Sequence, residues 1–544
     1  MGQRLPPFAV AALFQPPHPP TPGAVNSRYS ALTGPTFSGL TQSPTLPNAQ
    51  QSVTIRIAAT DPQGVASVVL KWKLDGGNSW NTAAMTLSDG AYQGQIAGQT
   101  AGALVQFYAE ASDGTTLSSF PGAGTASRAF IRWRDESAPT TPGHGIRILM
   151  STADANFMHA GTNVMSNDSF PCTVIYRESE VFYDAKVRLK SSQRGRLADV
   201  RVGFALEFDP MHLFRGAHTT INVDRSGYGR GTTGSGNGHS EIVSWHMFNR
   251  ARGVPSMYND MAYVIAPRSA NTGSAILTMA EFNDIWADSQ YENGADFPSF
   301  KYELIYYPTT TDDGTPEGLK VANPDEVNGV EFGSINSPDK EAFRWNFLIG
   351  NARNNDDFTR LINLSNTYQL TGNSFNSSII DAIDVDQWLR ASAALALVGV
   401  GDSYATSSGA WHNLKLYHRP DGRILYLPWD LDFQDRPYND SLIINPDIDA
   451  LTQISPTYRR LFYQHLDDII NTSFNSTYLS PWVSHYASFN ASGGNWNEIT
   501  SYVDERVAYA RSQQREQSPG WPVIRFIRRQ RRRIGEGWGN LGGV

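Results

Sequence analysis

Apolar and polar positions alternate in short runs over the first quarter of the chain. Turn-forming segments such as DPQG, DGGNS and SDGT separate four such runs, which are Val53–Ile57, Val65–Trp72, Ala91–Ile96 and Val105–Ala111. Short strands at close spacing with turn residues between them are typical of a β-sandwich. The pattern therefore predicts a sandwich over residues 35–135, with Trp72 and Trp80 in its core. Nothing in this segment gathers catalytic groups, so we expect it to serve spacing or adhesion.

Helical periodicity begins later in the chain. Apolar residues recur at helical spacing in Glu241–Arg252, Glu341–Ile349, Val385–Val398, Tyr458–Ile470 and Val503–Arg511. The third of these segments is apolar almost throughout, which is typical of a buried helix. The pattern also predicts a helix starting at Met279–Trp286 that carries Glu281, and a β-prone run at Lys301–Tyr307. Strands followed by helices predict an α+β protein.

A hairpin lies in the second half of the chain. Leu414–Tyr417 and Ile424–Leu427 are β-prone runs, and the turn sequence Pro-Asp-Gly lies between them. An antiparallel pairing of these runs brings Asn413 and Asp430 to the same end of the ribbon. Asp402 precedes the first strand, so the sequence predicts that several polar side chains converge there.

The side chains at this end of the hairpin are hard oxygen ligands. Carboxylates of Asp430 and Asp432 and the amide of Asn413 suit Mg²⁺, which prefers few protein ligands together with substrate phosphates. Phosphoryl transfer requires such a set, with one further Asp to orient the incoming hydroxyl. The competing interpretation is that Asp430 and Asp432 only cap turns, because short acidic motifs often match by chance.

Composition narrows the function classes. Hydrophobic residues make up 40% of the 544 residues and charged residues 18%, as in soluble globular proteins. The net charge of −8 argues against general nucleic-acid affinity. The single cysteine, Cys172, excludes an intrachain disulfide. No run approaches the ~20 apolar residues of a membrane span, and Phe8–Phe14 is too short for a clear signal peptide.

Composition also suggests boundaries. Residues 1–34 are rich in proline and are expected to form a disordered linker, residues 145–512 a catalytic domain, and residues 513–544 a basic, Gly-rich tail. The loop Asp224–His239 contains six glycines but lacks the ending of a P-loop. We expect it to be a mobile loop near the active site rather than a phosphate cradle. The sequence pattern does not predict an oligomeric state.

The run HNLKLYHRPDGRILYLPWDLDF resembles the signature of the CotH kinase family, the spore-coat-protein-H type of atypical protein kinases. Comparable segments follow in order over about residues 170–510, which suggests the large, multidomain bacterial branch. The N-terminal sandwich resembles fibronectin type III or immunoglobulin-like modules of extracellular bacterial enzymes. These resemblances imply a location outside a bacterium or on its surface, and this chain could be part of a longer secreted protein.

The family resemblance also implies site residues and cofactors. Asp402 would orient or deprotonate the accepting hydroxyl, Asn413 and Asp430 would bind the metal, and Asp432 would support them or bind a second metal. The implied reaction transfers the ATP γ-phosphate to Ser or Thr of protein partners, with Mg²⁺ or alternatively Mn²⁺.

One part of the family pattern is missing. The strand Val202–Phe208 is usually basic in the family, whereas Ala205 and Glu207 stand here. Lys190 or Arg188 would then contact the nucleotide, with Glu281 as an ion-pair partner, and Lys301 is another candidate. The missing cation also leaves open a catalytically weak pseudokinase that acts as a surface structural or adhesion module. A Mg²⁺-dependent hydrolase is a third alternative, which the ordered family match disfavours.

Overall fold

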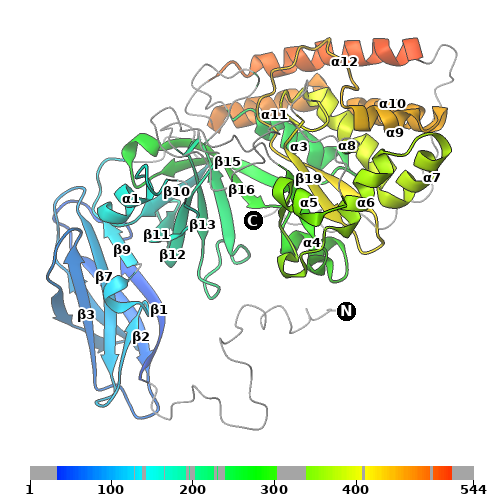
Figure 1. The fold of residues 1–544 in the computed structure, drawn as a ribbon. Coiled ribbons are helices and arrows are strands. Elements are labelled where there is room, and N and C mark those ends of the chain that lie inside the picture. The colour runs from blue at the N-terminus through cyan, green and yellow to red at the C-terminus, as the bar shows by residue number, and fades with distance from the viewer. Residues whose placement is uncertain are drawn as a thin grey trace, which may run out of the picture.

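The structure is a computed structural model that describes most of the chain. The described residues are 34–127, 129–137, 143–164, 166–191, 195–196, 202–225, 230, 239–302, 332, 338–406, 411–489 and 494–517. Nearly all of the expected linker and of the expected tail, and most of the Gly-rich loop, lie outside them. The described part is an α+β protein, as predicted, and it has three successive units (Figure 1).

The first unit is a sandwich of two antiparallel sheets, drawn in blue in Figure 1. Its strands are β1 (Thr36–Ser43), β2 (Val53–Thr60), β3 (Ser67–Leu74), β4 (Asn81–Ala84), β5 (Thr86–Ser88), β6 (Ala91–Ile96), β7 (Leu104–Ser112), β8 (Leu117–Phe120) and β9 (Ala129–Arg132). One sheet has the order β1-β2-β6-β5, the other β4-β3-β7-β8, and β9 pairs with β7. Ile55 of one sheet and Phe107 of the other share a buried core. The prediction of a β-rich N-terminal unit is confirmed.

The two tryptophans of the sandwich differ in their surroundings. Trp72 packs against the core, as predicted. The ring of Trp80 instead meets the ring of Tyr108 edge-on, with 4.9 Å between the ring centroids. The ammonium of Lys73 lies 5.2 Å from the centroid of the Trp80 ring.

The second unit is a closed barrel with the strand order β10-β11-β12-β13-β14-β16-β15. Its elements are β10 (His144–Leu149), α1 (Thr152–Met158), β11 (Phe170–Tyr176), β12 (Glu180–Lys190), β13 (Gly203–Glu207), β14 (Thr220–Asp224), β15 (Tyr258–Ile265) and β16 (Gly273–Ala280). Val187 and Leu189 of β12 belong to the barrel core. Because side chains alternate along a strand, Arg188 and Lys190 share the opposite face.

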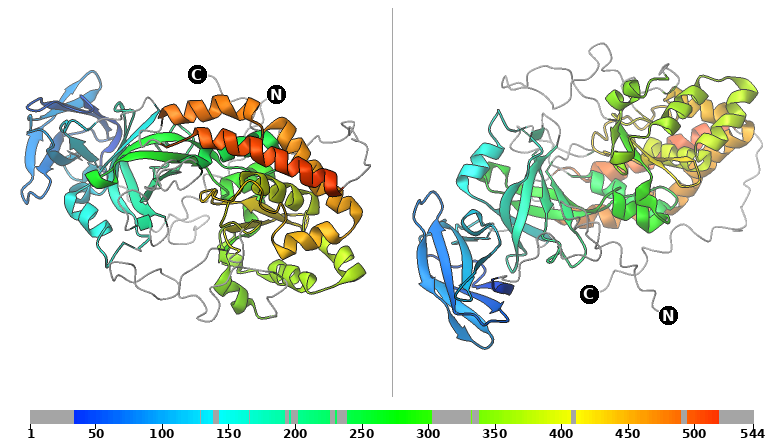
Figure 2. Two further views of the ribbon diagram at one scale, coloured as in Figure 1. Left: turned by 90° about the horizontal axis from the view of Figure 1, so that it is seen from above. Right: turned by 60° about the horizontal axis from the view of Figure 1, so that its bottom comes forward.

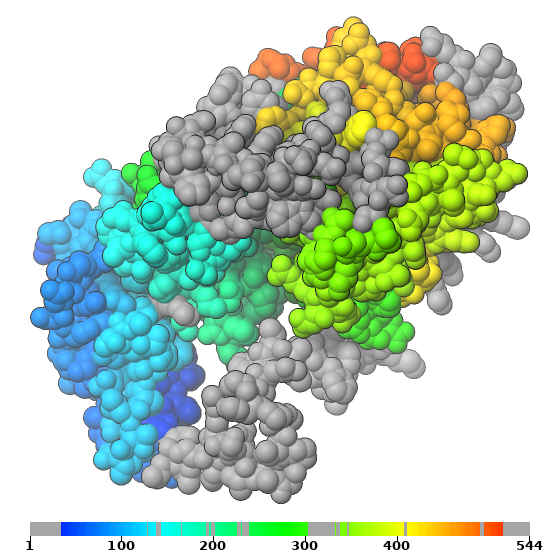
Figure 3. Space-filling view, in the orientation of Figure 1, coloured from blue at the N-terminus to red at the C-terminus, as the bar shows by residue number. Residues whose placement is uncertain are grey.

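The third unit contains most of the helices and a four-stranded sheet of order β18-β17-β19-β20. Its elements are α3 (Glu241–Ala251), α4 (Asp284–Gln290), β17 (Ser299–Tyr302), α5 (Lys340–Asn346), β18 (Leu348–Ile349), α6 (Thr359–Tyr368), α7 (Gly372–Ala382), α8 (Val385–Val398), β19 (Leu414–His418), β20 (Ile424–Pro428), α9 (Pro446–Gln453), α10 (Pro456–Thr472), α11 (Ser476–Phe489) and α12 (Asn497–Gln517). Figures 2 and 3 show the units following one another across the molecule.

Most predicted helices are present, and two predictions were wrong in detail. The buried helix Val385–Val398 was predicted with its observed bounds. The predicted helix Glu341–Ile349 ends at Asn346, because Leu348–Ile349 pairs with β17 as a strand. Glu281 does not lie on a helix, since α4 begins only at Asp284, where Asn283 provides the N-cap. In the described part of the chain no helix is long and apolar enough to cross a membrane.

Candidate active site

Two loops of the third unit bring Asp402 and Asp430 together. The first loop follows α8, which ends at Gly399 in a left-handed conformation, and the second follows β20. The amide of Gly401 donates a hydrogen bond to the carbonyl oxygen of Phe433 at 2.8 Å. A Cβ atom on Gly401 would lie only 2.1 Å from Oδ1 of Asp435. A larger residue at this position would have to displace the side chain of Asp435, so glycine lets the two loops lie close together without that shift.

The hairpin places Asn413 beside this junction. In the observed register Leu414 pairs with Pro428, so Asn413 and Asp430 lie at the same end of the ribbon, as the sequence predicts. Nδ2 of Asn413 donates a hydrogen bond to the backbone oxygen of Asp402 at 3.1 Å. Asn413 and Asp430 both have positive φ, 53° and 54°. Asn and Asp adopt this left-handed conformation more readily than other residues with a Cβ atom, so both residue types suit their positions.

The barrel supplies a cation to the same place. Nζ of Lys190, at the end of β12, forms an ion pair with Oδ2 of Asp224 at 3.2 Å. Burial lowers the pKa of Lys190, but the carboxylates of Asp224, Glu281 and Asp430 outweigh it and hold the pKa above its usual value. Glu281 also accepts a hydrogen bond from Nδ2 of Asn222. Lys190 thus faces the acidic residues of the third unit across the junction of the two units.

Burial and the neighbouring carboxylates raise the pKa of several carboxyl groups at this junction. Burial, reinforced by the carboxylate of Asp430, raises the pKa of Asp402 to about 8. Burial raises the pKa of Asp432 and that of Glu241 well above the usual values, and in both cases Asp430 is the strongest neighbouring charge. Asp224 acts on both groups as well. We call Asp224, Glu241, Asp402, Asp430 and Asp432 the acidic cluster.

The acidic cluster fits a divalent cation by its chemistry. Among the described residues, no three His, Cys, Asp or Glu side chains converge into a ready metal centre. Burial, and after it the neighbouring carboxylates, raises the pKa values of Asp402 and Glu241, and Oδ1 of Asp402 is buried without a hydrogen-bond partner. A bound cation reverses this shift by favouring the ionised carboxylates. Carboxylate and amide oxygens are the ligands that Mg²⁺ uses together with water and phosphates.

The two other candidate cations from the sequence, Arg188 and Lys301, and the acidic residue Glu207 have different surroundings. Arg188 lies on the same face of β12 as Lys190. In the β12–β13 register it lies directly across from Ala205, so a positive charge is present next to the position where the family has a basic residue. Lys301 lies on β17 and faces the ring of Trp429. Glu207 forms an exposed ion pair with Lys186, 2.7 Å between Nζ and Oε1.

Sequence reasoning missed two members of the acidic cluster. Asp224 ends β14, and Glu241 is the first residue of α3. Only weak signals in the sequence pointed to them: an Asp where a strand meets a Gly-rich loop, and a Glu that opens an otherwise apolar helix. Their place in the acidic cluster depends on the barrel and α3 facing the hairpin, which neither local pattern encodes.

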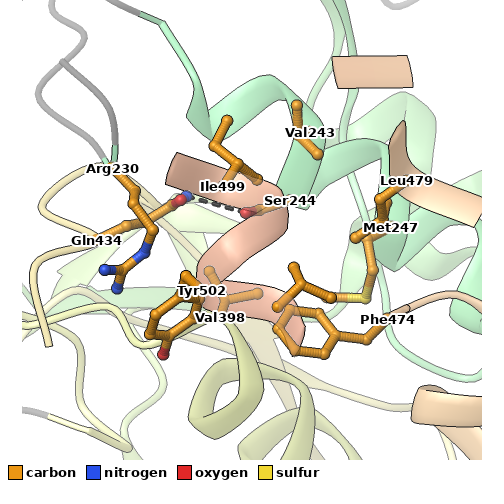
Figure 4. Close-up of a pocket in the computed structure, with 11 residues that line it drawn as sticks. Arg230, Val243, Ser244, Met247, Val398, Gln434, Phe474, Leu479, Ile499 and Tyr502 are labelled. Atoms are coloured by element: carbon orange, nitrogen blue, oxygen red, sulfur yellow. Dashed lines mark hydrogen bonds between the residues drawn. The ribbon is translucent and has the colours of Figure 1, made fainter. Parts of the chain in front are cut away.

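A small cavity lies beside the site, between α3, α8 and α12 (Figure 4). It has about 20 Å³, which is room for about one water molecule. Gln434 spans its edge and donates a hydrogen bond to Oγ of Ser244 at 2.9 Å. The guanidinium of Arg230 lies 3.3 Å from the ring centroid of Tyr502. The cavity is too small for a nucleotide, so it belongs to the packing behind the acidic cluster.

The model of one protein family matches part of the chain. The model of the family described as CotH kinase protein matches residues 331–532, which are 202 of the 544 residues. The match contains Asp402, Asn413, Asp430 and Asp432. The resemblance predicted from the hairpin sequence is thereby confirmed for this part of the chain.

Other comparisons carry no argument about function. A Br derivative of BhCBM56 has a TM-score of 0.11 at 18% identity, over 12% of this chain and 71% of that one. The cycloalternan-forming enzyme from Listeria monocytogenes in complex with pentasaccharide substrate has a TM-score of 0.14 at 13% identity, over 34% of this chain and 17% of that one. Both TM-scores are too low to indicate a shared fold. No curated protein matches the sequence.

Proposed function

We propose that this chain, whose residues 331–532 match the CotH kinase protein family, is an atypical protein kinase that transfers the γ-phosphate of ATP to Ser or Thr hydroxyls of partner proteins. One observation supports this most strongly. The ion pair of Lys190 with Asp224 on the barrel faces Asp402, Asp430 and Asp432 on the helical unit. Enzymes of phosphoryl transfer combine a lysine that contacts the nucleotide phosphates with acidic side chains that hold metal ions and position the accepting hydroxyl.

Each residue of this arrangement has a proposed role. A bound cation would favour the ionised form of Asp402. In that form Asp402 orients the accepting hydroxyl and takes its proton, and its Oδ1 atom, which has no hydrogen-bond partner, is suited to that task. Asn413 and Asp430 would hold Mg²⁺, or Mn²⁺ in its place, and Asp432 supports them. A bound metal ion would neutralise negative charge on the phosphates of the nucleotide. Lys190 holds a phosphate of the nucleotide, while Asp224 and Glu281 fix the position of its ammonium.

We also propose that the protein acts outside a bacterial cell or on its surface. The support for this is the resemblance of the N-terminal sandwich to fibronectin type III or immunoglobulin-like modules of extracellular enzymes. Ser and Thr hydroxyls of proteins in that compartment are then the accepting groups.

A catalytically weak pseudokinase is a second candidate. The absence of a basic residue at Ala205 favours it, because the family pattern has a cation on that strand. Arg188 lies directly across from Ala205 and favours an active kinase, because it places a positive charge next to that position.

Transfer of label from γ-labelled ATP separates these candidates. The native protein with Mg²⁺ or Mn²⁺ is compared with Asp402→Asn, Asp430→Asn and the control Asp421→Asn, which changes an exposed residue at the turn of the same hairpin. We expect label transfer to fall by about 10²-fold or more in Asp402→Asn, because a positioned proton acceptor contributes that much. Asp430→Asn should also lose metal-dependent ATP binding, and Asp421→Asn should remain active.

The outcomes are distinct. Full activity of Asp402→Asn or Asp430→Asn would reject the kinase assignment. Metal-dependent ATP binding by the native protein, without any transfer of label to itself or to added proteins, would support the pseudokinase instead.

A further inference from the structure

The segment 399–406, which carries Asp402, is held at both of its ends by Arg436. It begins at Gly399, where α8 ends, and the backbone amide of Arg436 donates a hydrogen bond to the carbonyl oxygen of Gly399 at 3.3 Å. At the other end, Nη1 of Arg436 donates a hydrogen bond to the carbonyl oxygen of Thr406. One residue therefore contacts the first and the last residue of the segment.

The segment itself is compact and largely buried. The hydroxyl of Thr406 donates a hydrogen bond to the carbonyl oxygen of Val400, and it lies 2.7 Å from the hydroxyl of Ser403. Ser403 and Thr406 are both buried. Well-packed protein interiors transmit displacements rather than absorb them. A shift at the ends of the segment therefore moves Asp402.

Arg436 lies on the loop that also carries Asp430. This loop follows β20, so Arg436 joins the loop of Asp430 to the segment of Asp402. Nη2 of Arg436 forms an ion pair with Oδ2 of Asp440 at 2.6 Å, and the side chain is 11% exposed. The carbonyl oxygen of Arg436 accepts a hydrogen bond from Nη2 of Arg230 at 2.9 Å. These contacts fix the position of Arg436 itself.

The chemistry of arginine suits this arrangement. Its planar guanidinium presents several N–H donors in fixed directions, so one side chain can bind a carbonyl oxygen and a carboxylate at the same time. Hydrogen bonds from a charged donor are also stronger than neutral ones. A lysine at this position would keep the charge but would hold the same two partners less firmly.

We propose that Arg436 is a positioning residue, which fixes Asp402 against Asp430 in the geometry that transfer to an accepting hydroxyl needs. This inference rests on the proposed function. Arg436 acts through the backbone of Gly399 and Thr406, so its loss misplaces Asp402 without removing a metal ligand. Misplacement of a reacting group by about 1 Å can slow an enzymatic step by about 10²-fold. The rate of transfer should therefore depend on Arg436 much more than the affinity for ATP does.

Arg390 provides a matched control for variants of Arg436. Its side chain is also buried, donates hydrogen bonds to the carbonyl oxygens of Ala251 and Arg252, and forms an ion pair with Asp468 at 2.6 Å. These contacts join α8 to α3 and α10 rather than to the segment 399–406. Arg390→Met therefore removes a buried guanidinium of the same kind without freeing the segment of Asp402.

The experiment compares Arg436→Met, Arg436→Lys and Arg390→Met in the full chain. Transfer of label from γ-labelled ATP to the chain itself and to dephosphorylated casein is measured at saturating Mg²⁺-ATP. The affinity for Mg²⁺-ATP is measured separately by isothermal titration, and the stability of each variant by thermal denaturation.

We expect Arg436→Met to lower the rate of label transfer at saturating ATP by about 10- to 100-fold, with the affinity for ATP nearly unchanged. Arg436→Lys keeps a positive charge beside Asp440 and should lose less, and it serves as the test if the Met variant does not fold. Arg390→Met should lower the melting temperature and leave the rate of the folded protein close to that of the native chain.

A combination with Asp402→Asn separates positioning from a general loss of structure. If Arg436 acts through Asp402, the double variant of Asp402→Asn and Arg436→Met transfers label no more slowly than Asp402→Asn alone, because residues that act as a unit have non-additive effects. A further loss in the double variant, by the factor that Arg436→Met causes alone, would overturn the proposal.

Hydrogen exchange of backbone amides tests the same contacts without any activity. Exchange within residues 399–406 should become faster in Arg436→Met and stay native-like in Arg390→Met, and unchanged exchange in Arg436→Met contradicts the proposal. Native rates of transfer in Arg436→Met, while Asp402→Asn loses transfer, reject the positioning role and leave the proposed function standing. If the native chain transfers no label at all, the proposed function fails, and this role of Arg436 fails with it.

Discussion

The hydroxyl of Tyr183, on barrel strand β12, donates a hydrogen bond to Oε1 of Gln42, on sandwich strand β1, at 2.9 Å, and both side chains are buried. Successive side chains of a strand point to opposite faces, so Phe182 and Tyr183 are buried on opposite sides. The backbone at Asp184 has a φ of 55°, and this irregularity in the pairing with β11 returns Ala185 to the barrel core. Phe182 enters the barrel core, whereas Tyr183 enters the sandwich core. The sandwich is therefore packed against the strand that ends at Lys190.

Tyr183→Phe tests how firmly the sandwich and barrel are joined. The substitution keeps the ring and removes the donor to Gln42, so a buried acceptor loses its partner. We expect the free energy of unfolding to fall by about 1–3 kcal/mol, measured by urea denaturation. Tyr92→Phe, at a half-buried position of β6, should change it by much less. An equal effect of both substitutions would show that the contact between Tyr183 and Gln42 contributes nothing specific.

Asp224→Asn tests the ion pair that holds Lys190. The variant keeps a similar shape but removes the charge that positions the ammonium group and raises its pKa. We expect ATP to bind about tenfold more weakly, equivalent to about 1.4 kcal/mol, with the fold retained, as measured by isothermal titration and circular dichroism. Rescue by Asp224→Glu would support a positioning role.

Glu207→Lys is the matched control for that experiment. The side chain of Glu207 is 48% exposed and forms an ion pair with Lys186. Lys186 precedes Lys190 on β12 by two pleats of the strand. If this strand lined the phosphates, the added lysine would tighten nucleotide binding. With Glu207 exposed on the far part of the strand, we expect no change in ATP affinity. Tighter binding would bring this strand into the nucleotide site.

His418 should make the protein sensitive to acid. Burial lowers the pKa of His418 to about 3, whereas an exposed histidine has a pKa of about 6.5. The folded state disfavours the charged ring, so the stability from neutral His418 is complete above pH 6.5 and is lost as the pH falls toward 3. At pH 5 the loss is about 2 kcal/mol.

Urea denaturation at pH 7.5 and pH 5 checks this prediction. His418→Phe should lose less stability between the two pH values than the native protein, since the buried titratable group is gone. His212→Phe, at an exposed position, should behave like the native protein. The same pH dependence in His418→Phe and the native protein would contradict the prediction.

The sequence by itself determined the elements in which a local pattern has one outcome. An apolar run of helical length gave α8, and the Pro-Asp-Gly turn gave the hairpin of β19 and β20 that brings Asn413 to the same end as Asp430. The hairpin sequence also identified the family that matches residues 331–532. Turn chemistry and hydrophobic period act over few residues, so they can be read without the fold.

Only the tertiary structure decided which distant groups meet. Asp224 and Glu241 join the acidic cluster because the barrel and α3 face the hairpin, and Lys301 meets Lys415 because β17 pairs with β19. Burial then sets the charge of Asp402, whose raised pKa depends on solvent exclusion and on Asp430. Electrostatic coupling and burial arise from packing between segments far apart in the chain, and no local pattern of residues encodes them.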